Sequence, residues 1–108
     1  MANTFTRYVS KNVGTTPVVL VTAASATQTT LIGMSVANTT SSPISVSIYV
    51  TASATNYYVV NSATIPVGGS LALFGGDGKL VLNTGDAFTV VSSAANSADV
   101  IVSALQIT

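Results

Sequence analysis

Short runs in which apolar and small polar residues alternate are the feature that most constrains the fold of this chain. The clearest run covers residues 44–51, where Ile44, Val46, Ile48 and Val50 alternate with Ser45, Ser47, Tyr49 and Thr51. Successive side chains of a β-strand point to opposite faces, so this period of two predicts a half-buried strand. No long stretch shows the 3.6-residue apolar period that an amphipathic helix needs.

Comparable runs recur along the whole chain. They lie at residues 4–10, 18–22, 30–37, 57–65, 70–74, 79–82, 87–92 and 99–107. Glycine, proline, asparagine and aspartate separate many of them, and these residues favour turns. Eight or nine strands at intervals of about 8–12 residues are typical of an all-β sandwich or barrel. We therefore predict an all-β fold, a single β-sandwich of the jelly-roll or Ig-like type, with eight to nine short and mostly antiparallel strands.

The run at residues 30–37 carries a specific expectation about which side chains reach the core. Simple alternation places Leu31, Gly33, Ser35 and Ala37 on one face and Ile32, Met34 and Val36 on the other. Under this reading Leu31 and Met34 lie on opposite faces of the sheet.

The chain has 108 residues, a length that fits one domain over residues 1–108. Residues 1–14 form either an extended N-terminal arm or the first strand of that domain. In this segment Phe5, Arg7 and Val9 share one face of a strand, and Arg7 and Lys11 are two of the three cations of the chain. Such an arm would reach an acidic neighbouring surface, whereas a first strand would carry the same charges in solvent.

Only 6% of the residues are charged, against about 25% in an ordinary soluble domain. The charged residues are Arg7, Lys11, Lys79, Asp77, Asp86 and Asp99, and the chain contains no His, Cys or Glu. Disulfides, thiolate or imidazole metal sites and histidine-based acid–base catalysis are therefore excluded. Three scattered cations do not form a nucleic-acid-binding stripe, and the apolar runs are too short for a membrane-spanning helix. We predict no catalytic residues, no metal and no cofactor, and the composition points away from an enzyme.

Two local patterns resemble functional motifs. Residues 75–79 read Gly-Gly-Asp-Gly-Lys, but their spacing fits neither a dinucleotide fingerprint nor a calcium loop, so they predict a glycine turn. Residues 38–40, Asn-Thr-Thr, match a glycosylation acceptor pattern, which we interpret as a turn. The three aspartates are expected to be solvated turn residues and not a catalytic carboxylate pair.

The tyrosines are the side chains best suited to a protein interface. Tyr57 and Tyr58 are adjacent, so they must point to opposite faces of a strand. Tyr49 lies on the polar side of its run. Exposed tyrosines anchor protein interfaces or stack on sugars. The alternative, to which we give equal weight, is that these rings pack against small neighbouring side chains within the chain.

The missing charge also predicts self-association. A surface of small polar residues has little desolvation penalty on docking, and strand edges without charges do not block edge pairing. We expect a homo-oligomer, with a trimer favoured. The interface candidates are Phe5, Arg7, Tyr8, Lys11, Tyr49 and Tyr57.

The second half of the chain resembles a group of small virion proteins of tailed bacteriophages, including cyanophages. The resemblance lies in residues 65–71 (IPVGGSL), 75–82 (GGDGKLVL), 84–86 (TGD) and 92–100 (SSAANSADV), with similar residues at 2–5 and 35–40. It implies a β-sandwich structural subunit of the capsid or of the neck and tail, and it brings no catalytic motif.

This resemblance implies a function and a location. The first expectation is a capsid cement or decoration protein that stabilises capsomer junctions by protein–protein contacts. Its partners would be further copies of itself and the major capsid protein or neighbouring virion subunits, without nucleic acid or membrane. It would be made in the host cytoplasm and would lie on the capsid exterior. A neck, tail or baseplate ring component is the alternative, and a receptor- or glycan-binding fibre module is a third class.

Overall fold

The computed structural model describes residues 3–23, 27–73 and 79–107, and nine strands lie in this part of the chain. The strands are β1 (Asn3–Val13), β2 (Val18–Thr22), β3 (Gln28–Asn38), β4 (Ile44–Ala52), β5 (Thr55–Ile65), β6 (Ser70–Leu73), β7 (Leu80–Leu82), β8 (Ala87–Ser92) and β9 (Ala98–Ile107). Among the described residues, no helix is long and apolar enough to cross a membrane. The all-β prediction is confirmed.

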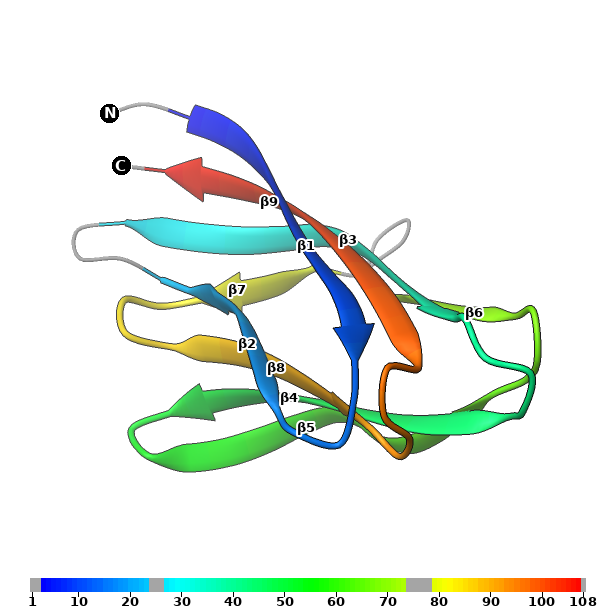
Figure 1. Ribbon diagram of the computed structural model, residues 1–108. Coiled ribbons are helices and arrows are strands. Elements are labelled where there is room, and N and C mark those ends of the chain that lie inside the picture. Colours follow the sequence, from blue (N-terminus) through cyan, green and yellow to red (C-terminus); the bar gives the residue numbers. More distant parts are fainter. Residues whose placement is uncertain (1–2, 24–26, 74–78, 108) are drawn as a thin grey trace.

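The strands form two antiparallel sheets that pack face to face (Figure 1). Sheet A has the order β1-β9-β3-β6, and β7 pairs with the same edge of β3 as a separate short strand. Sheet B has the order β2-β8-β4-β5. With β6 and β7 counted as one interrupted strand, this is the order of a jelly roll, which decides between the two sandwich types that the sequence left open.

Most connections cross from one sheet to the other, so their turns gather at the two ends of the sandwich (Figure 1). One end, which we call the Asn38 end, holds the turns at residues 14–17, 39–43, 66–69 and 93–97. The opposite end, the Ser53 end, holds the turns at residues 53–54 and 83–86, together with the start of β1 and the end of β9.

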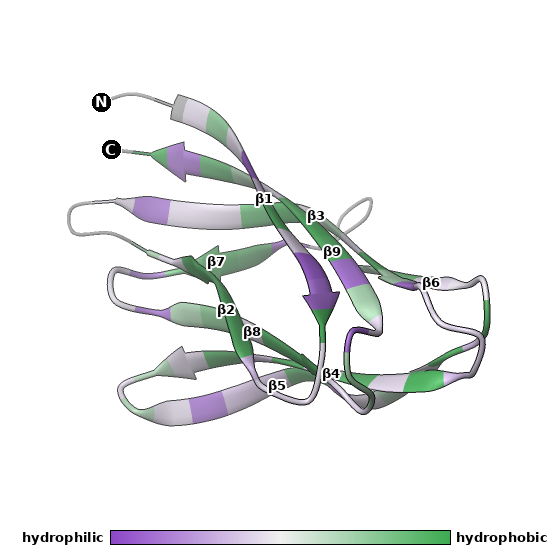
Figure 2. Ribbon diagram, in the orientation of Figure 1, coloured by the Kyte–Doolittle hydropathy of each residue, from purple (hydrophilic) through white to green (hydrophobic). Residues whose placement is uncertain are grey.

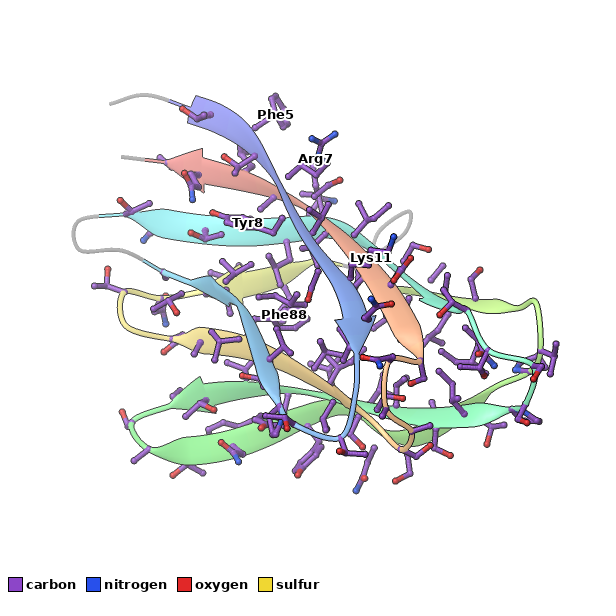
Figure 3. The ribbon with its side chains drawn as sticks, in the orientation of Figure 1. Phe5, Arg7, Tyr8, Lys11 and Phe88 are labelled. Atoms are coloured by element: carbon purple, nitrogen blue, oxygen red, sulfur yellow. The ribbon has the colours of Figure 1, made fainter. Side chains whose placement is uncertain are left out.

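The core lies between the two sheets and is built from the inward-facing residues of both. Phe88 of β8 is completely buried and lies between the sheets (Figure 3), packed in a cluster of valine, isoleucine, leucine, alanine and methionine side chains. Figure 2 shows apolar and weakly polar residues along most strands, with a strongly hydrophilic stretch at the arrow end of β1. Small branched side chains suit this arrangement, because they pack well on pleated surfaces.

One alternation prediction is wrong at β3. The register of β3 against β9 shifts between Leu31 and Gly33, which marks a β-bulge. An extra residue in the strand reverses the facing of everything that follows it. Leu31 and Met34 are consequently both buried in the core, where simple alternation placed them on opposite faces.

At the Asn38 end, the turn between β8 and β9 is held against the start of the β1–β2 turn. Ser97 donates its backbone N–H to the carbonyl of Val13 at 2.9 Å, and Ser92 donates to the carbonyl of Gly14 at 2.9 Å. A Cβ atom on Gly14 would come within 3.2 Å of the Cα of Ala95. Glycine at this position therefore permits the close approach of the two backbones.

Candidate interaction surface

The outer face of sheet A carries a group of exposed apolar side chains on β1 and β9. The register places Phe5 opposite Leu105 and Val9 opposite Ile101, so all four project from the same face. Phe5 is 76% exposed, Val9 63% and Ile101 50%, and Leu105 is half-buried. We call these four residues the sheet A patch. Large apolar side chains in such a group are typical of interaction sites.

Two cations border the sheet A patch. Arg7 lies opposite Ser103, between the row of Phe5 and the row of Val9, and its side chain is exposed. Lys11 is exposed near the end of β1, beyond Val9. In Figure 3, Phe5 and Arg7 point away from the sandwich. The exposed face of β1 therefore alternates between apolar and cationic side chains.

Tyr8 occupies a different environment. It is half-buried and packs against the core, on the face of β1 opposite to Phe5 and Arg7. Its hydroxyl accepts a hydrogen bond from the side-chain amide of Gln106 in β9. These contacts within the chain occupy both the ring and the hydroxyl of Tyr8.

The other two predicted tyrosines lie in sheet B. Tyr49 of β4 is half-buried on the outer face, with its ring centroid 5.2 Å from that of Tyr58 and the ring planes tilted by 50°. Tyr57 lies opposite Val50, on the core-facing side of β5, and is nevertheless 60% exposed. The six predicted residues therefore do not form one surface: Phe5, Arg7 and Lys11 lie on the outer face of sheet A, Tyr8 lies against the core, and Tyr49 and Tyr57 lie on opposite faces of sheet B.

Sequence reasoning missed the contribution of β9 to the sheet A patch. Ile101 and Leu105 share the face of Phe5, while Val100, Val102 and Ala104 face the core. The signal was present in residues 100–102, Val-Ile-Val, because an uninterrupted apolar run places apolar side chains on both faces of a strand.

The asparagine of the glycosylation-like pattern has a structural role. Asn38 is buried, and its Nδ2 donates to the carbonyls of Ser42, Ile65 and Pro66 at 2.9, 3.1 and 3.2 Å. Its Oδ1 accepts hydrogen bonds from the backbone N–H and the hydroxyl of Thr40, at 2.9 and 2.8 Å. Because the amide nitrogen that a glycan would modify is fully engaged, the pattern marks a hydrogen-bonded turn.

The two described aspartates each accept a backbone N–H, Asp86 in a turn and Asp99 from within strand β9, so Asp99 is not the solvated turn residue that the sequence predicted. Asp86 Oδ2 accepts the N–H of Asn83 at 3.0 Å, at the Ser53 end. Asp99 Oδ1 accepts the N–H of Asn12 at 3.0 Å, at the Asn38 end, where a register shift and a φ of 58° mark a bulge in β1. These two carboxylates therefore lie at opposite ends of the sandwich. Asp77 and the predicted glycine turn around it lie outside the described residues.

Within the ranges that the structure describes, no cluster of acidic side chains has the composition of a metal site, and no pocket is present. The described surface of the molecule therefore offers sheet faces and strand edges as its candidate functional features.

Comparison with known proteins gives a likeness of fold. No protein-family model matches the chain, and no curated protein sequence matches it. Among the solved structures that resemble it is a chain from a structure described as "Bacillus endospore appendages form a novel family of disulfide-linked pili". The two chains share 13% sequence identity with a TM-score of 0.57, and the match covers 98% of this chain and 88% of that chain.

Proposed function

We propose that this chain is a structural subunit that acts by binding other proteins in a large assembly. The observation that carries the proposal is the sheet A patch, in which Phe5, Val9 and Ile101 are each at least half exposed on the same face of the sheet. Soluble single subunits usually surround such a face with mixed charges, and this chain has few charges to supply. Full burial of each of these side chains in a contact would contribute about 1.5–3 kcal/mol.

We place that assembly in the virion of a tailed phage, with the chain as a capsid cement or decoration protein. This placement rests on the resemblance carried by the turn and strand sequences of residues 65–107. A trimer on the capsid exterior would contact the major capsid protein at capsomer junctions. Its mechanism is passive, because buried interface lowers the free energy of the assembled shell relative to its parts. A neck, tail or baseplate ring is the second placement.

The likeness to the pilus chain is consistent with a structural role. That protein forms pili that are linked by disulfides. The present chain contains no cysteine, so an assembly of it would rest on non-covalent contacts alone. Buried apolar side chains and backbone hydrogen bonds are then the available sources of affinity.

Counting the copies of this protein in purified virions tests the placement. A copy number of three per capsomer junction supports a decorating trimer, and the low copy number of a single ring supports the neck or tail. Absence of the protein from purified virions would contradict both placements. Quantitative mass spectrometry against a labelled standard gives the number directly.

Substitutions in the sheet A patch test the proposed contact. Phe5→Ser and Ile101→Thr should each weaken binding to shells that lack the protein by about 30-fold, or roughly 2 kcal/mol. The melting temperature should change little, because both side chains are exposed in the free chain. Val67→Ser is the control, since Val67 is exposed to about the same extent as Ile101 but lies in the turn after β5. Equal binding by all three variants would place the contact elsewhere.

A further inference from the structure

The edge of sheet B formed by β5 is unprotected. β5 pairs only with β4, most of its eleven residues are exposed, and it contains neither a charged residue nor a proline. The edge strands elsewhere in the described structure differ: β1 carries two cations, and β2, β6 and β7 have five residues or fewer. Natural proteins usually blunt a long edge with charges or proline, because unpaired backbone groups template the addition of another strand.

The free backbone groups of this edge can be assigned from the hairpin that precedes it. Ala52 and Thr55 pair across a two-residue turn, in which Ser53 and Ala54 both have positive φ. Hydrogen-bonded and non-hydrogen-bonded pairs alternate along an antiparallel ladder. The N–H and C=O groups of Asn56 and Tyr58 are therefore directed away from β4.

The regular part of the edge is short. The register of β5 against β4 shifts twice after Tyr58, and Ser62 has a φ of 55°. Bulges twist an edge and interrupt pairing. The segment available to a new strand is therefore residues 55–58.

Tyr57 is exposed although it lies on the core-facing side of sheet B. On the inner face of sheet B, Val21, Phe88, Val50 and Tyr57 form one row across the four strands. The first three are buried, whereas Tyr57 is 60% exposed. One further strand at this edge would pair with the free backbone groups. An apolar side chain on that strand would cover the exposed ring of Tyr57.

We propose that a second copy of this chain supplies that strand, with residues 56–58 of the two copies pairing antiparallel about a two-fold axis at Tyr57. In this register Asn56 of each copy lies opposite Tyr58 of the other, so their outward N–H and C=O groups satisfy one another. The two Tyr57 side chains then face each other directly and continue the core row across the contact. The segment is self-complementary because its free groups lie symmetrically around Tyr57, as an isologous interface requires.

This pairing does not depend on the proposed function, and it uses a different surface from the sheet A patch. It predicts an even number of copies in solution: two, or six where two of the proposed trimers pair through β5. A free trimer would contradict this pairing and leave the proposed function intact. Both sheets stay intact, since residues 56–58 gain partners on their open side only.

Single cysteine substitutions test the register, because the natural chain has none. In the proposed pair, the Cα atoms of the two residues 57 are about 4.5 Å apart, within the range of about 4.4–6.8 Å that a disulfide spans. The two residues 58 are diagonal neighbours at roughly 7–8 Å. Tyr57→Cys should therefore form covalent dimers at least tenfold faster than Tyr58→Cys under mild oxidation. Tyr58 is the matched control because it is adjacent and 54% exposed. Equal rates for the two variants would overturn the pairing.

Native mass spectrometry of the unmodified chain gives the second measurement. We expect an even number of copies, and Tyr57→Lys should weaken the association at least tenfold, because it places like charges opposite each other at the axis. Thr64→Lys is the control, since Thr64 is an exposed residue of β5 beyond the bulges. A mass of one or three copies for the natural chain would contradict the proposal. That result is also expected if the β5 edge binds a different protein. Shell binding by the Tyr57→Lys chain tests the proposed function separately, because the sheet A patch is unchanged.

Discussion

The two ends of the sandwich differ in how their buried polar side chains are hydrogen-bonded. At the Asn38 end, one buried side chain donates to three carbonyls and accepts two hydrogen bonds. At the Ser53 end, the hydroxyl of Thr29 is buried without a hydrogen-bond partner in the described structure. Ser53 and Ala54 also hold positive φ angles that glycine or asparagine adopt more readily.

β5 runs from one of these ends to the other and shows what the contrast means. Its last residue, Ile65, is buried, and its carbonyl accepts a hydrogen bond from Asn38. Its first four residues are exposed and have a free backbone edge. The Asn38 end thus satisfies its groups within the chain, whereas the Ser53 end leaves groups that other molecules can satisfy.

Of the substitutions that test this contrast, Asn38→Asp should have the largest effect on stability. The substitution keeps the shape of the side chain but replaces the donor to three carbonyls with a carboxylate oxygen, and an unpaired buried charge is strongly unfavourable. The free energy of unfolding should fall by about 3 kcal/mol or more. Urea denaturation measures it.

Asn61→Asp is the matched control for that experiment. Asn61 is exposed on β5, and its Oδ1 accepts a hydrogen bond from Ser62 that aspartate can also accept. We expect a change within about 0.5 kcal/mol. A comparable loss in both variants would show that the buried network is not what stabilises the Asn38 end.

A smaller effect, here a gain in stability, is expected from replacing the two residues with positive φ in the turn at the Ser53 end. Replacing Ser53 with asparagine and Ala54 with glycine supplies the residues that a two-residue turn with two positive φ angles prefers. The free energy of unfolding should rise by about 1–2 kcal/mol. The reverse-order variant, Ser53→Gly with Ala54→Asn, is the control and should gain less; no gain in either variant would mean that this turn is not strained.

The smallest expected effect is at Thr29. Thr29→Val replaces the unpaired hydroxyl with a methyl group of similar size and keeps the branched shape that strands favour. The chain should become more stable by about 1 kcal/mol, a rise of about 4 °C in melting temperature. Thr64→Val, at an exposed position of β5 beyond the bulges, is the control. A loss of stability in Thr29→Val would show that the hydroxyl is hydrogen-bonded in solution.

Much of the fold was predictable because strand alternation is a local property. Residues 18–22 and 87–92 form strands with the predicted bounds, and the run at 44–51 is extended by only one residue. The β3 bulge was not predicted, since a register shift depends on how β9 pairs with β3. The role of Asn38 was also beyond the sequence, because two of its acceptors lie 27 and 28 residues away along the chain.

The interface candidates show the same limit. Alternation correctly placed Phe5 and Arg7 on one face, but it could not tell which face of the first strand would be covered. Tyr8 packs against the core because its face of β1 is the one turned toward sheet B. The unusual exposure of Tyr57 follows from the position of β5 at the sheet edge, which is a matter of topology and not of local sequence.

The pairing of β1 with β9 joins the beginning of the domain to its end, with Asn3 opposite Ile107. During synthesis, sheet A therefore stays incomplete until the last strand has left the ribosome, and the edges of β1 and β3 that β9 will occupy remain open until then. Pairings between distant parts of a chain form slowly, and open strand edges favour aggregation while they last. The addition of β9 therefore completes sheet A, and conditions that slow this pairing prolong the exposure of both edges.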